Sequence, residues 1–126
     1  MLSGDFYTTT SMQVGEETIL ATLQLNPAHR IFEGHFPGTP VVPGVCMMQM
    51  IKELLESALR VKCRLIHADH AKFLSVINPL EQACIQAAIQ YKQEGGGVTS
   101  VKATFFNEQV TFLKYQARFK QLHPAT

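Results

Sequence analysis

The sequence has no strong excess of charge of either sign and no long hydrophobic run. Its 11 Lys and Arg residues nearly balance its 10 Asp and Glu residues, which leaves a formal net charge of +1. A nucleic-acid-binding domain is usually far more basic, and the chain has neither a Lys/Arg run nor interleaved aromatic residues. No apolar run reaches the length of a transmembrane helix, and the first residues lack the charged-then-apolar layout of a signal peptide. We therefore expect a cytoplasmic protein.

Cysteine is also scarce. The three cysteines, Cys46, Cys63 and Cys84, are odd in number and lack Cys-x-x-Cys spacing, which argues against a disulfide framework. Cys46 is a candidate nucleophile because the first turn of a helix stabilises a thiolate, but its apolar neighbours favour simple packing. The five histidines are scattered. His67 and His70 should point to opposite faces of a strand, so we predict no metal site.

The rest of the composition fits a single domain over residues 1–126, with 46% hydrophobic residues for its core. Alternating segments predict a hairpin from residues 6–25, a strand from 64–73, and three further strands in a meander after residue 81. One long apolar helix lies between the second and third strands. A single small sheet can bury such a helix only by curling around it, which predicts an α+β fold with a curved, mainly antiparallel sheet.

Residues 31–56 are the stretch that points to a function. They begin with a segment that carries His35 and is interrupted by glycines and prolines, which favour turns and extended backbone over helix. A helix is predicted from Gly44 to Arg60, because Pro43 blocks helical geometry before it and no further glycine or proline lies within this span. Its apolar residues cover most of the circumference, so the helix should be buried.

A histidine held beside the start of a buried helix is a candidate catalytic group. The first turn of a helix offers unpaired N–H donors and a partial positive charge. His35 can exchange a proton near neutral pH. From residue types alone, the alternative that this loop is only a set of tight turns stays open.

Three segments resemble one known family. GHFPGTPVVPGV, residues 34–45, closely resembles the active-site signature of the β-hydroxyacyl-acyl-carrier-protein dehydratases of type II fatty-acid synthesis, which have a hot-dog fold. HADHAKFLSVINPLEQ, residues 67–82, resembles the strand and turn of that family, and GGGVTSVKATFF, residues 95–106, the hairpin that follows. The resemblance implies a hot-dog fold and a dimer whose two sheets join edge to edge, with substrate tunnels at the interface.

The resemblance also implies a reaction. The substrate would be a (3R)-hydroxyacyl chain on the phosphopantetheine arm of acyl carrier protein, and loss of water would give the trans-2-enoyl thioester. His35 would remove the α-proton, and the amide of Gly44 would hold the thioester carbonyl. No metal or organic cofactor is required. Phe36, Val41 and Phe73 are expected in the tunnel wall, with ordinary core packing as the alternative.

One position departs from the family pattern. The family has a helical Glu or Asp as its second catalytic residue, but this chain has Gln49, which cannot donate a proton and become charged. Glu53 lies four residues later, on the same face of the helix. In one hypothesis Glu53, with a raised pKa, supplies the proton while Gln49 positions the hydroxyl or a water, and His35 acts from the partner chain. In the other, Glu53 lies at the dimer seam or pairs with a cation such as Lys52, and the site is degenerate.

The substitution leaves three functions open. The chain can be a dehydratase with a shifted acid, a hot-dog thioesterase in which Gln49 orients water, or a non-catalytic subunit that pairs with an active homologue. The first two differ in their product, a 2-enoyl thioester or a free acid. The third predicts co-purification with a related chain and no turnover alone.

A group of basic residues suggests a partner. Arg60, Lys62, Arg64 and Lys72 lie close in the sequence around the end of the predicted helix and the next strand. Because carrier proteins are acidic, we predict that these residues form the carrier-protein docking surface, with a solvated turn as the alternative. The expected assembly is a homodimer, or a heterodimer with a homologue, in which both chains line each tunnel.

Overall fold

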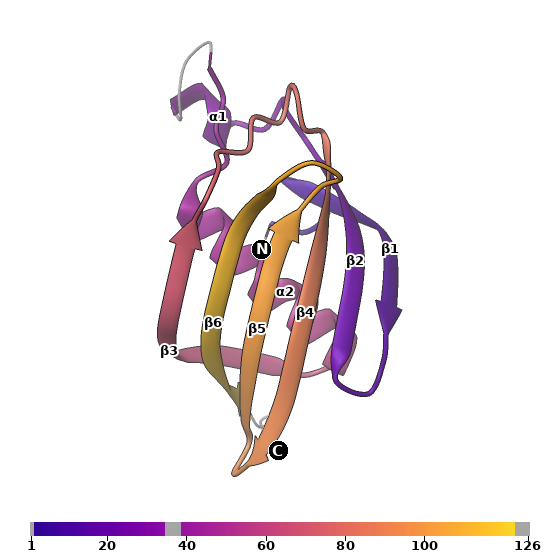
Figure 1. The fold of residues 1–126 in the computed structure, drawn as a ribbon, viewed down its shortest axis with the longest axis vertical. Coiled ribbons are helices and arrows are strands. Elements are labelled where there is room, and N and C mark those ends of the chain that lie inside the picture. The colour runs from indigo at the N-terminus through magenta and orange to yellow at the C-terminus, as the bar shows by residue number, and fades with distance from the viewer. Residues whose placement is uncertain (1, 35–38, 123–126) are drawn as a thin grey trace.

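The computed structural model describes residues 2–34 and 39–122, in which an antiparallel six-stranded sheet curves around one long helix (Figure 1). The order of the strands across the sheet is β1-β2-β4-β5-β6-β3. The predicted hot-dog arrangement is confirmed. The elements are β1 (Tyr7–Val14), β2 (Thr18–Leu25), α1 (Ile31–Gly34), α2 (Gly44–Leu59), β3 (Lys62–Phe73), β4 (Cys84–Gly95), β5 (Val98–Phe106) and β6 (Thr111–Leu122).

The meander of β4, β5 and β6 follows the alternation of apolar and polar residues. On β4, Ile85, Ala87 and Ile89 are buried against the helix, while the residues between them face outward. The turn between β4 and β5 has positive φ at three consecutive residues, 95–97, which glycine adopts without steric cost. The predicted start at Glu81 is three residues early, because the backbone N–H of Glu81 donates to the Asn78 carbonyl in a turn.

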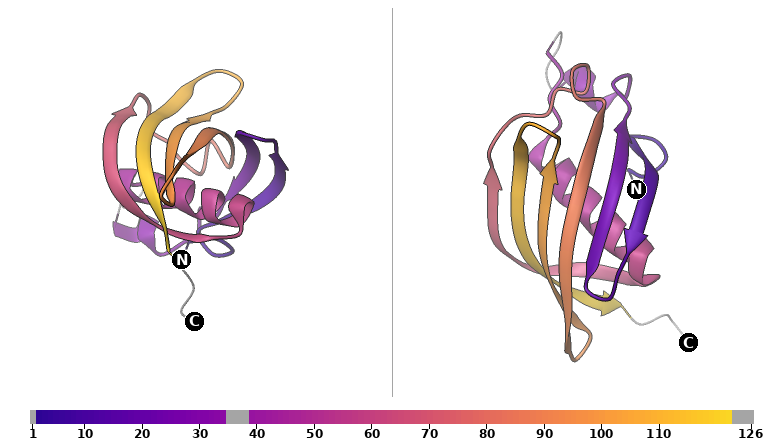
Figure 2. Two further views of the ribbon diagram at one scale, coloured as in Figure 1. Left: turned by 90° about the horizontal axis from the view of Figure 1, so that it is seen from below. Right: turned by 45° about the vertical axis from the view of Figure 1, so that its right-hand side comes forward.

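Helix α2 lies inside the curve of the sheet (Figure 2). Pro43, with extended backbone, precedes its first residue, as predicted, and Arg60 ends it in the left-handed conformation with φ of 55°. Its N–H donates to the Glu56 carbonyl. The buried residues of the helix are Cys46, Met47, Met50, Ile51, Glu53, Leu54 and Leu55. Glu53 is the one charged residue in this otherwise apolar set, so its carboxylate needs hydrogen-bond donors.

The loop that precedes α2 differs from the prediction of turns alone. It contains α1, a single helical turn. Two backbone bonds hold it, from the N–H of Phe32 to the His29 carbonyl and from Glu33 to Arg30. No glycine or proline interrupts residues 28–33, so this turn can form before the Gly/Pro-rich segment begins. The ring of Phe32 is buried and stacks on Phe6, with 5.2 Å between ring centroids.

Strand β3 forms one edge of the sheet and pairs with β6 on one side only. Cys63 is its only buried residue. The register shifts between Leu65 and His67 and again between Ala68 and His70. His67 therefore lies opposite Arg118 and His70 opposite Gln116, two residues apart on β6 and so on one face. The prediction that these histidines face opposite ways is wrong, because the irregular register removes the simple alternation.

Candidate functional site

A groove of about 610 Å³ opens at the start of α2. Its walls come from the segment before the helix, the first turn of the helix, and the end of β3 with the residues that follow. The lining residues are Val41, Val42, Pro43, Gly44, Met47, Phe73, Leu74, Ser75 and Val76. Val41, Gly44 and Phe73, which the sequence predicted for the site, thus lie together in one largely apolar groove.

Gly44 has no room for a side chain in this groove. A Cβ atom built on Gly44 would lie 2.8 Å from Cζ of Phe73, which is closer than van der Waals contact allows. No side chain caps the helix, and the first helical hydrogen bonds come from the N–H groups of Cys46 and Met47 to the Pro43 carbonyl. Within residues 2–34 and 39–122, the N–H groups of Gly44 and Val45 have no such partner. N–H groups in the first turn of a helix can donate to a carbonyl or oxyanion.

Gln49 and Glu53 are joined by a hydrogen bond, as their spacing predicts. Nε2 of Gln49 donates to Oε2 of Glu53 over 2.9 Å. An ionised carboxylate only accepts hydrogen bonds, so the NH₂ group of Gln49 must face it. The Oε1 atom of Gln49 then points away from Glu53 as an acceptor.

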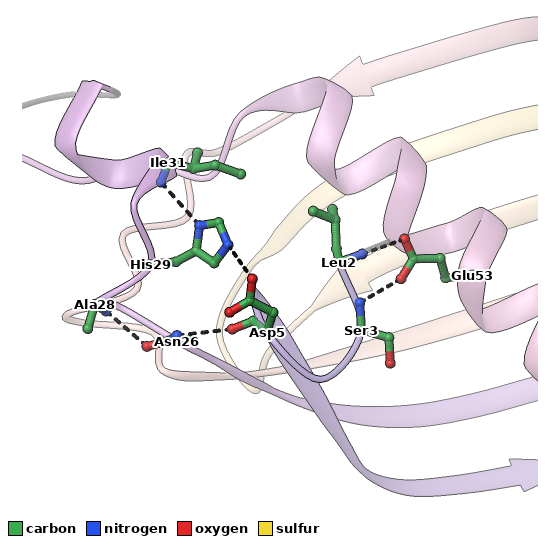
Figure 3. A network of polar contacts seen from close by, with 8 residues as sticks. All are labelled: Leu2, Ser3, Asp5, Asn26, Ala28, His29, Ile31 and Glu53. Atoms are coloured by element: carbon green, nitrogen blue, oxygen red, sulfur yellow. Dashed lines mark hydrogen bonds and ion pairs between the residues drawn. The ribbon is translucent and has the colours of Figure 1, made fainter.

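Glu53 is also the anchor of the N-terminal segment (Figure 3). The N–H of Leu2 donates to its Oε2 over 2.9 Å, and the N–H of Ser3 to its Oε1 over 2.8 Å. The hydroxyl of Tyr7 donates to Oε1 as well, over 3.1 Å. Glu53 is only 4% exposed, so its charge is balanced by these donors and by Gln49 rather than by water.

These contacts reverse the expected pKa shift of Glu53. Burial alone would raise the pKa of this carboxyl, but its four hydrogen bonds, from the backbone of Leu2, from Gln49, from the backbone of Ser3 and from Tyr7, together lower it. Burial and the nearby Glu53 charge raise the pKa of Tyr7, so its hydroxyl stays protonated and donates. The predicted raised pKa of Glu53 is wrong. The alternative pairing with Lys52 is not found either, because backbone amides take its place.

The same N-terminal segment holds the chain that leads into the site loop (Figure 3). His29 donates from Nε2 to the Asp5 carboxylate over 3.1 Å, and its Nδ1 accepts the N–H of Ile31 over 3.1 Å. The side chain of Asn26 donates to the Asp5 carbonyl over 3.0 Å. Residues 2–7 thus connect the middle of α2 with α1, directly before the predicted His35.

Two predicted site residues, His35 and Phe36, lie outside the described residues. Gln49 does not line the groove at Gly44. At 3.6 residues per turn, two positions five residues apart project about 140° from each other around a helix. Gly44 and Gln49 therefore face different sides of α2 within one chain.

The four basic residues predicted to form one docking cluster are separated within one chain. Arg60, Lys62 and Arg64 lie at the end of α2 and the start of β3, whereas Lys72 lies at the other end of β3, opposite Lys114. Ten residues of strand span roughly 33 Å. Proximity in the sequence was a poor guide to proximity in space here, because an extended strand has the largest rise per residue of the regular backbone conformations.

The structure does not favour a nucleophilic role for Cys46. Burial raises the pKa of the Cys46 thiol, which disfavours the reactive thiolate. Cys46, Cys63 and Cys84 are all free. No group of three or more His, Cys, Asp or Glu residues among those described is arranged to hold a metal ion. No described helix is both long and apolar enough to span a bilayer.

Comparison with known proteins identifies the family. Residues 11–110 match the family described as ApeI-like, ApeI dehydratase. The chain belongs to the ApeI-like dehydratase family. It is 30% identical to 3-hydroxyacyl-acyl-carrier-protein dehydratase FabZ of Rickettsia conorii over 97 residues, covering 71% of this chain and 67% of the relative. It is 26% identical to FabZ of Oenococcus oeni, covering 76% of this chain and 74% of the relative.

Solved structures support the fold of this ApeI-like chain. The dehydratase heterocomplex ApeI:P from Xenorhabdus doucetiae matches with a TM-score of 0.70 and 18% identity, over 89% of this chain and 96% of that one. A hypothetical thioesterase with coenzyme A from Streptococcus pneumoniae matches with a TM-score of 0.64 and 8% identity, over 98% and 94% of the two chains. At such identities the likeness establishes the hot-dog fold alone.

Sequence reasoning missed the contribution of Leu2, Ser3 and Tyr7 to the ApeI-like site. Leu2 and Ser3 act through their backbone N–H groups, which every residue except proline has, so residue type carried no signal. The one available signal was Glu53 itself. A carboxylate on a helix that is apolar over most of its circumference requires buried donors.

We predict that Glu53→Gln lowers the free energy of unfolding by about 2 to 3 kcal/mol near neutral pH, because an amide leaves one of the two backbone N–H donors without an acceptor. The folded pKa of Glu53 lies below its ordinary value of 4.5. The advantage of the wild type is therefore complete above about pH 5 and is lost as the pH falls through the folded pKa. Urea unfolding at several pH values measures it. The exposed Glu81→Gln serves as control, and equal pH profiles for all three proteins would contradict the assignment.

We also predict that Gly44 and Phe73 are energetically coupled. Gly44→Ala should destabilise the wild type, because the new Cβ displaces the ring of Phe73. In a Phe73→Ala background the same change should be neutral or stabilising, since alanine is a better helix former than glycine. A double-mutant cycle of thermal unfolding measures the coupling, and a cost of Gly44→Ala that is equal in both backgrounds would refute the contact.

Proposed function

We propose that this ApeI-like protein eliminates water from (3R)-hydroxyacyl thioesters carried by acyl carrier protein and gives trans-2-enoyl thioesters for fatty-acid or polyene-type lipid synthesis. The observation that carries the proposal is the family match over residues 11–110. The FabZ relatives are named for the same reaction class on carrier-bound substrate. No metal or organic cofactor enters the proposed chemistry, and a cytoplasmic location goes with it.

In the proposed reaction, His35 removes the α-proton of the substrate, a role assigned by resemblance. The N–H groups of the first turn of α2, chiefly that of Gly44, donate to the thioester carbonyl, since no side chain of the described residues caps this helix. As the α-proton leaves, negative charge builds on this oxygen, and a donor placed there typically lowers the barrier by about 3 to 4 kcal/mol. The apolar groove formed by Val41 and Phe73, with Phe36 by resemblance, would hold the acyl chain.

The role proposed for Gln49 is to orient the 3-hydroxyl. Its amide is fixed by the bond to Glu53, so Oε1 can accept the hydroxyl hydrogen. This leaves the lone pairs of the hydroxyl oxygen free to take a proton.

Glu53 is not proposed as the acid, because its lowered pKa and four hydrogen bonds keep it ionised. His35 can serve both steps. It takes the proton from the α-carbon as the C–H bond breaks, and the resulting imidazolium returns that proton to the hydroxyl as the C–O bond breaks. The products are the enoyl thioester, one water and neutral His35, so protons and electrons balance without a second acid.

The proposed assembly is a dimer through the β3 edge, either of two copies or with a homologue. An edge strand exposes unpaired backbone groups. Around this edge lie the exposed side chains of Val45, Leu65, Ile66, Phe73, Leu74 and Val76, of which Val45 is 75% exposed. A second chain would cover this surface. It would also allow Gln49 of one chain to meet the groove of the other, which one chain alone does not achieve. The ApeI:P dehydratase of Xenorhabdus doucetiae is a heterocomplex, which supports the mixed form.

The decisive experiment is to offer 3-hydroxyacyl and 2-enoyl thioesters on carrier protein and identify the products by mass. We expect interconversion of the two thioesters, which differ by one water. His35→Ala should reduce turnover at least 100-fold, because general base catalysis usually contributes about that much. Free acid as the product would instead identify a thioesterase, and absence of turnover without a co-purifying homologue would identify a non-catalytic subunit.

Two variants of Gln49 separate an active site from a degenerate one. Gln49→Ala should slow dehydration while the fold is retained, because the hydroxyl loses its acceptor. Gln49→Glu places a second carboxylate against Glu53, so it should also lower the rate of an active enzyme. If the wild type is inactive and Gln49→Glu creates turnover, the site is degenerate.

The edge-to-edge assembly gives a separate prediction. Sedimentation or light scattering at micromolar concentration should show a dimer, or a dimer only after addition of a homologue. Ile66→Asp, on the β3 edge, should yield monomers. Leu20→Asp is a matched control, because Leu20 is 43% and Ile66 46% exposed, but Leu20 lies on the interior strand β2. A stable wild-type monomer with no partner, or equal effects of both variants, would refute this assembly.

A further inference from the structure

The outer face of the sheet, away from α2, carries a basic hollow. A depression of about 340 Å³ spans β4, β5, β6 and β3 next to the end of β3. Its charged groups are Lys72, Lys102 and Lys114, and His70 lies beside them. Gln90, Thr104 and Gln116 complete the polar part of its floor. We call this depression the basic hollow.

The lysines of the basic hollow form no ion pair with any described residue. Lys72 lies directly opposite Lys114 in the register of β3 and β6. Like charges in such a pair destabilise a sheet. Among the residues that the structure describes, no carboxylate lies within ion-pair distance of Lys72, Lys102 or Lys114. Asp69, which is shared between Arg118 and His67 at 3.2 and 3.3 Å, and Glu17 line an adjoining depression together with Lys102. Neither carboxylate forms an ion pair with that lysine. An anionic partner would remove this repulsion.

The basic hollow lies next to the groove at the start of α2. Lys72 is followed directly by Phe73, whose ring lies against Gly44. The hollow and the groove are therefore neighbours at one end of the molecule, on two sides of the end of β3. By contrast, Arg60 and Lys62 lie at the far end of α2, which spans about 24 Å at about 1.5 Å per residue.

We infer that the basic hollow is the docking surface for a carboxylate-rich face of the carrier protein that presents the thioester. The inference rests on the proposed function, because it takes its occupant from the carrier-bound substrate. We choose an acidic carrier protein as the occupant because its charge is complementary to that of the lysines. Three lysines without an ion-pair partner among the described residues attract an acidic protein and speed its association. The adjoining groove receives the acyl arm.

The test compares two charge reversals that are chemically identical. Lys114→Glu changes the basic hollow, whereas Lys92→Glu changes an outward-facing lysine near the other end of β4. The register places Lys92 four residues along the sheet and two strands across from Lys114, or roughly 16 Å away. This is about two Debye lengths at physiological salt and about one at roughly 0.05 M, so Lys92→Glu measures the effect of a reversed charge outside the hollow.

Binding of labelled holo acyl carrier protein is measured by fluorescence anisotropy at about 0.05 M and about 0.5 M salt. We expect Lys114→Glu to weaken binding about threefold to tenfold at low salt, and Lys102→Glu combined with Lys114→Glu to weaken it more than tenfold. Lys92→Glu should stay within about twofold of the wild type, and the differences should shrink at high salt. Circular dichroism checks that the variants are folded.

Turnover separates docking from chemistry. The double variant should raise KM for carrier-bound substrate and leave turnover of a short pantetheine thioester unchanged. Equal losses in Lys92→Glu and Lys114→Glu, unchanged affinity in the double variant, or no wild-type binding to the carrier would overturn the inference. Salt-sensitive carrier binding that needs the hollow, combined with no dehydration of either substrate, would refute the proposed function and leave the docking surface standing.

Discussion

The buried carboxylate of Glu53 is the interaction on which the arrangement of the site depends. It sits on the central helix and takes hydrogen bonds from the N-terminal segment, from β1 and from Gln49. A buried charge requires hydrogen-bond donors, and the backbone N–H groups of Leu2 and Ser3 supply them. The chain near these two residues therefore packs against the middle of α2. Phe6 then stacks on Phe32 and positions α1 at the entrance to the site loop. One charge thereby fixes both the start of the chain and the approach to His35.

The same charge gives Glu53 and Gln49 different parts in the structure of α2. A carboxylate that accepts four hydrogen bonds is stabilised in its ionised form and is poorly suited to give up a proton. Its effect on Gln49 is orientation, because only the NH₂ group of the amide can face it. Glu53 is therefore a structural anchor, and in the proposed reaction Gln49 is the oriented acceptor. A mechanism that uses His35 for both proton steps is compatible with this division, whereas a mechanism that needs a helical acid is not.

The sequence predicted those features that depend on repeated local patterns. Alternation along β4, β5 and β6 predicted the buried faces. Pro43 and the run of apolar helix formers after it predicted α2 to within one residue. The predictions that were wrong concern features that depend on tertiary contacts. The turn α1 is stabilised because Phe32 stacks on Phe6. The side of the sheet on which His67 and His70 lie depends on where the register of β3 shifts against β6. The pKa of Glu53 could not be predicted from its apolar neighbours alone, because three of its four donors come from about fifty residues away.

The basic residues show how assembly can restore what one chain separates. Within one chain, Lys62 and Lys72 stand at opposite ends of β3. In the proposed dimer, antiparallel pairing of two β3 edges with the middle of each strand on the twofold axis would reverse one strand against the other. The start of β3, with Lys62 and Arg64, would then approach the partner's Lys72. The cluster predicted from the sequence would then form across the interface and add its positive charge to the basic hollow. Dimerisation would therefore strengthen the attraction of this surface for an acidic carrier protein.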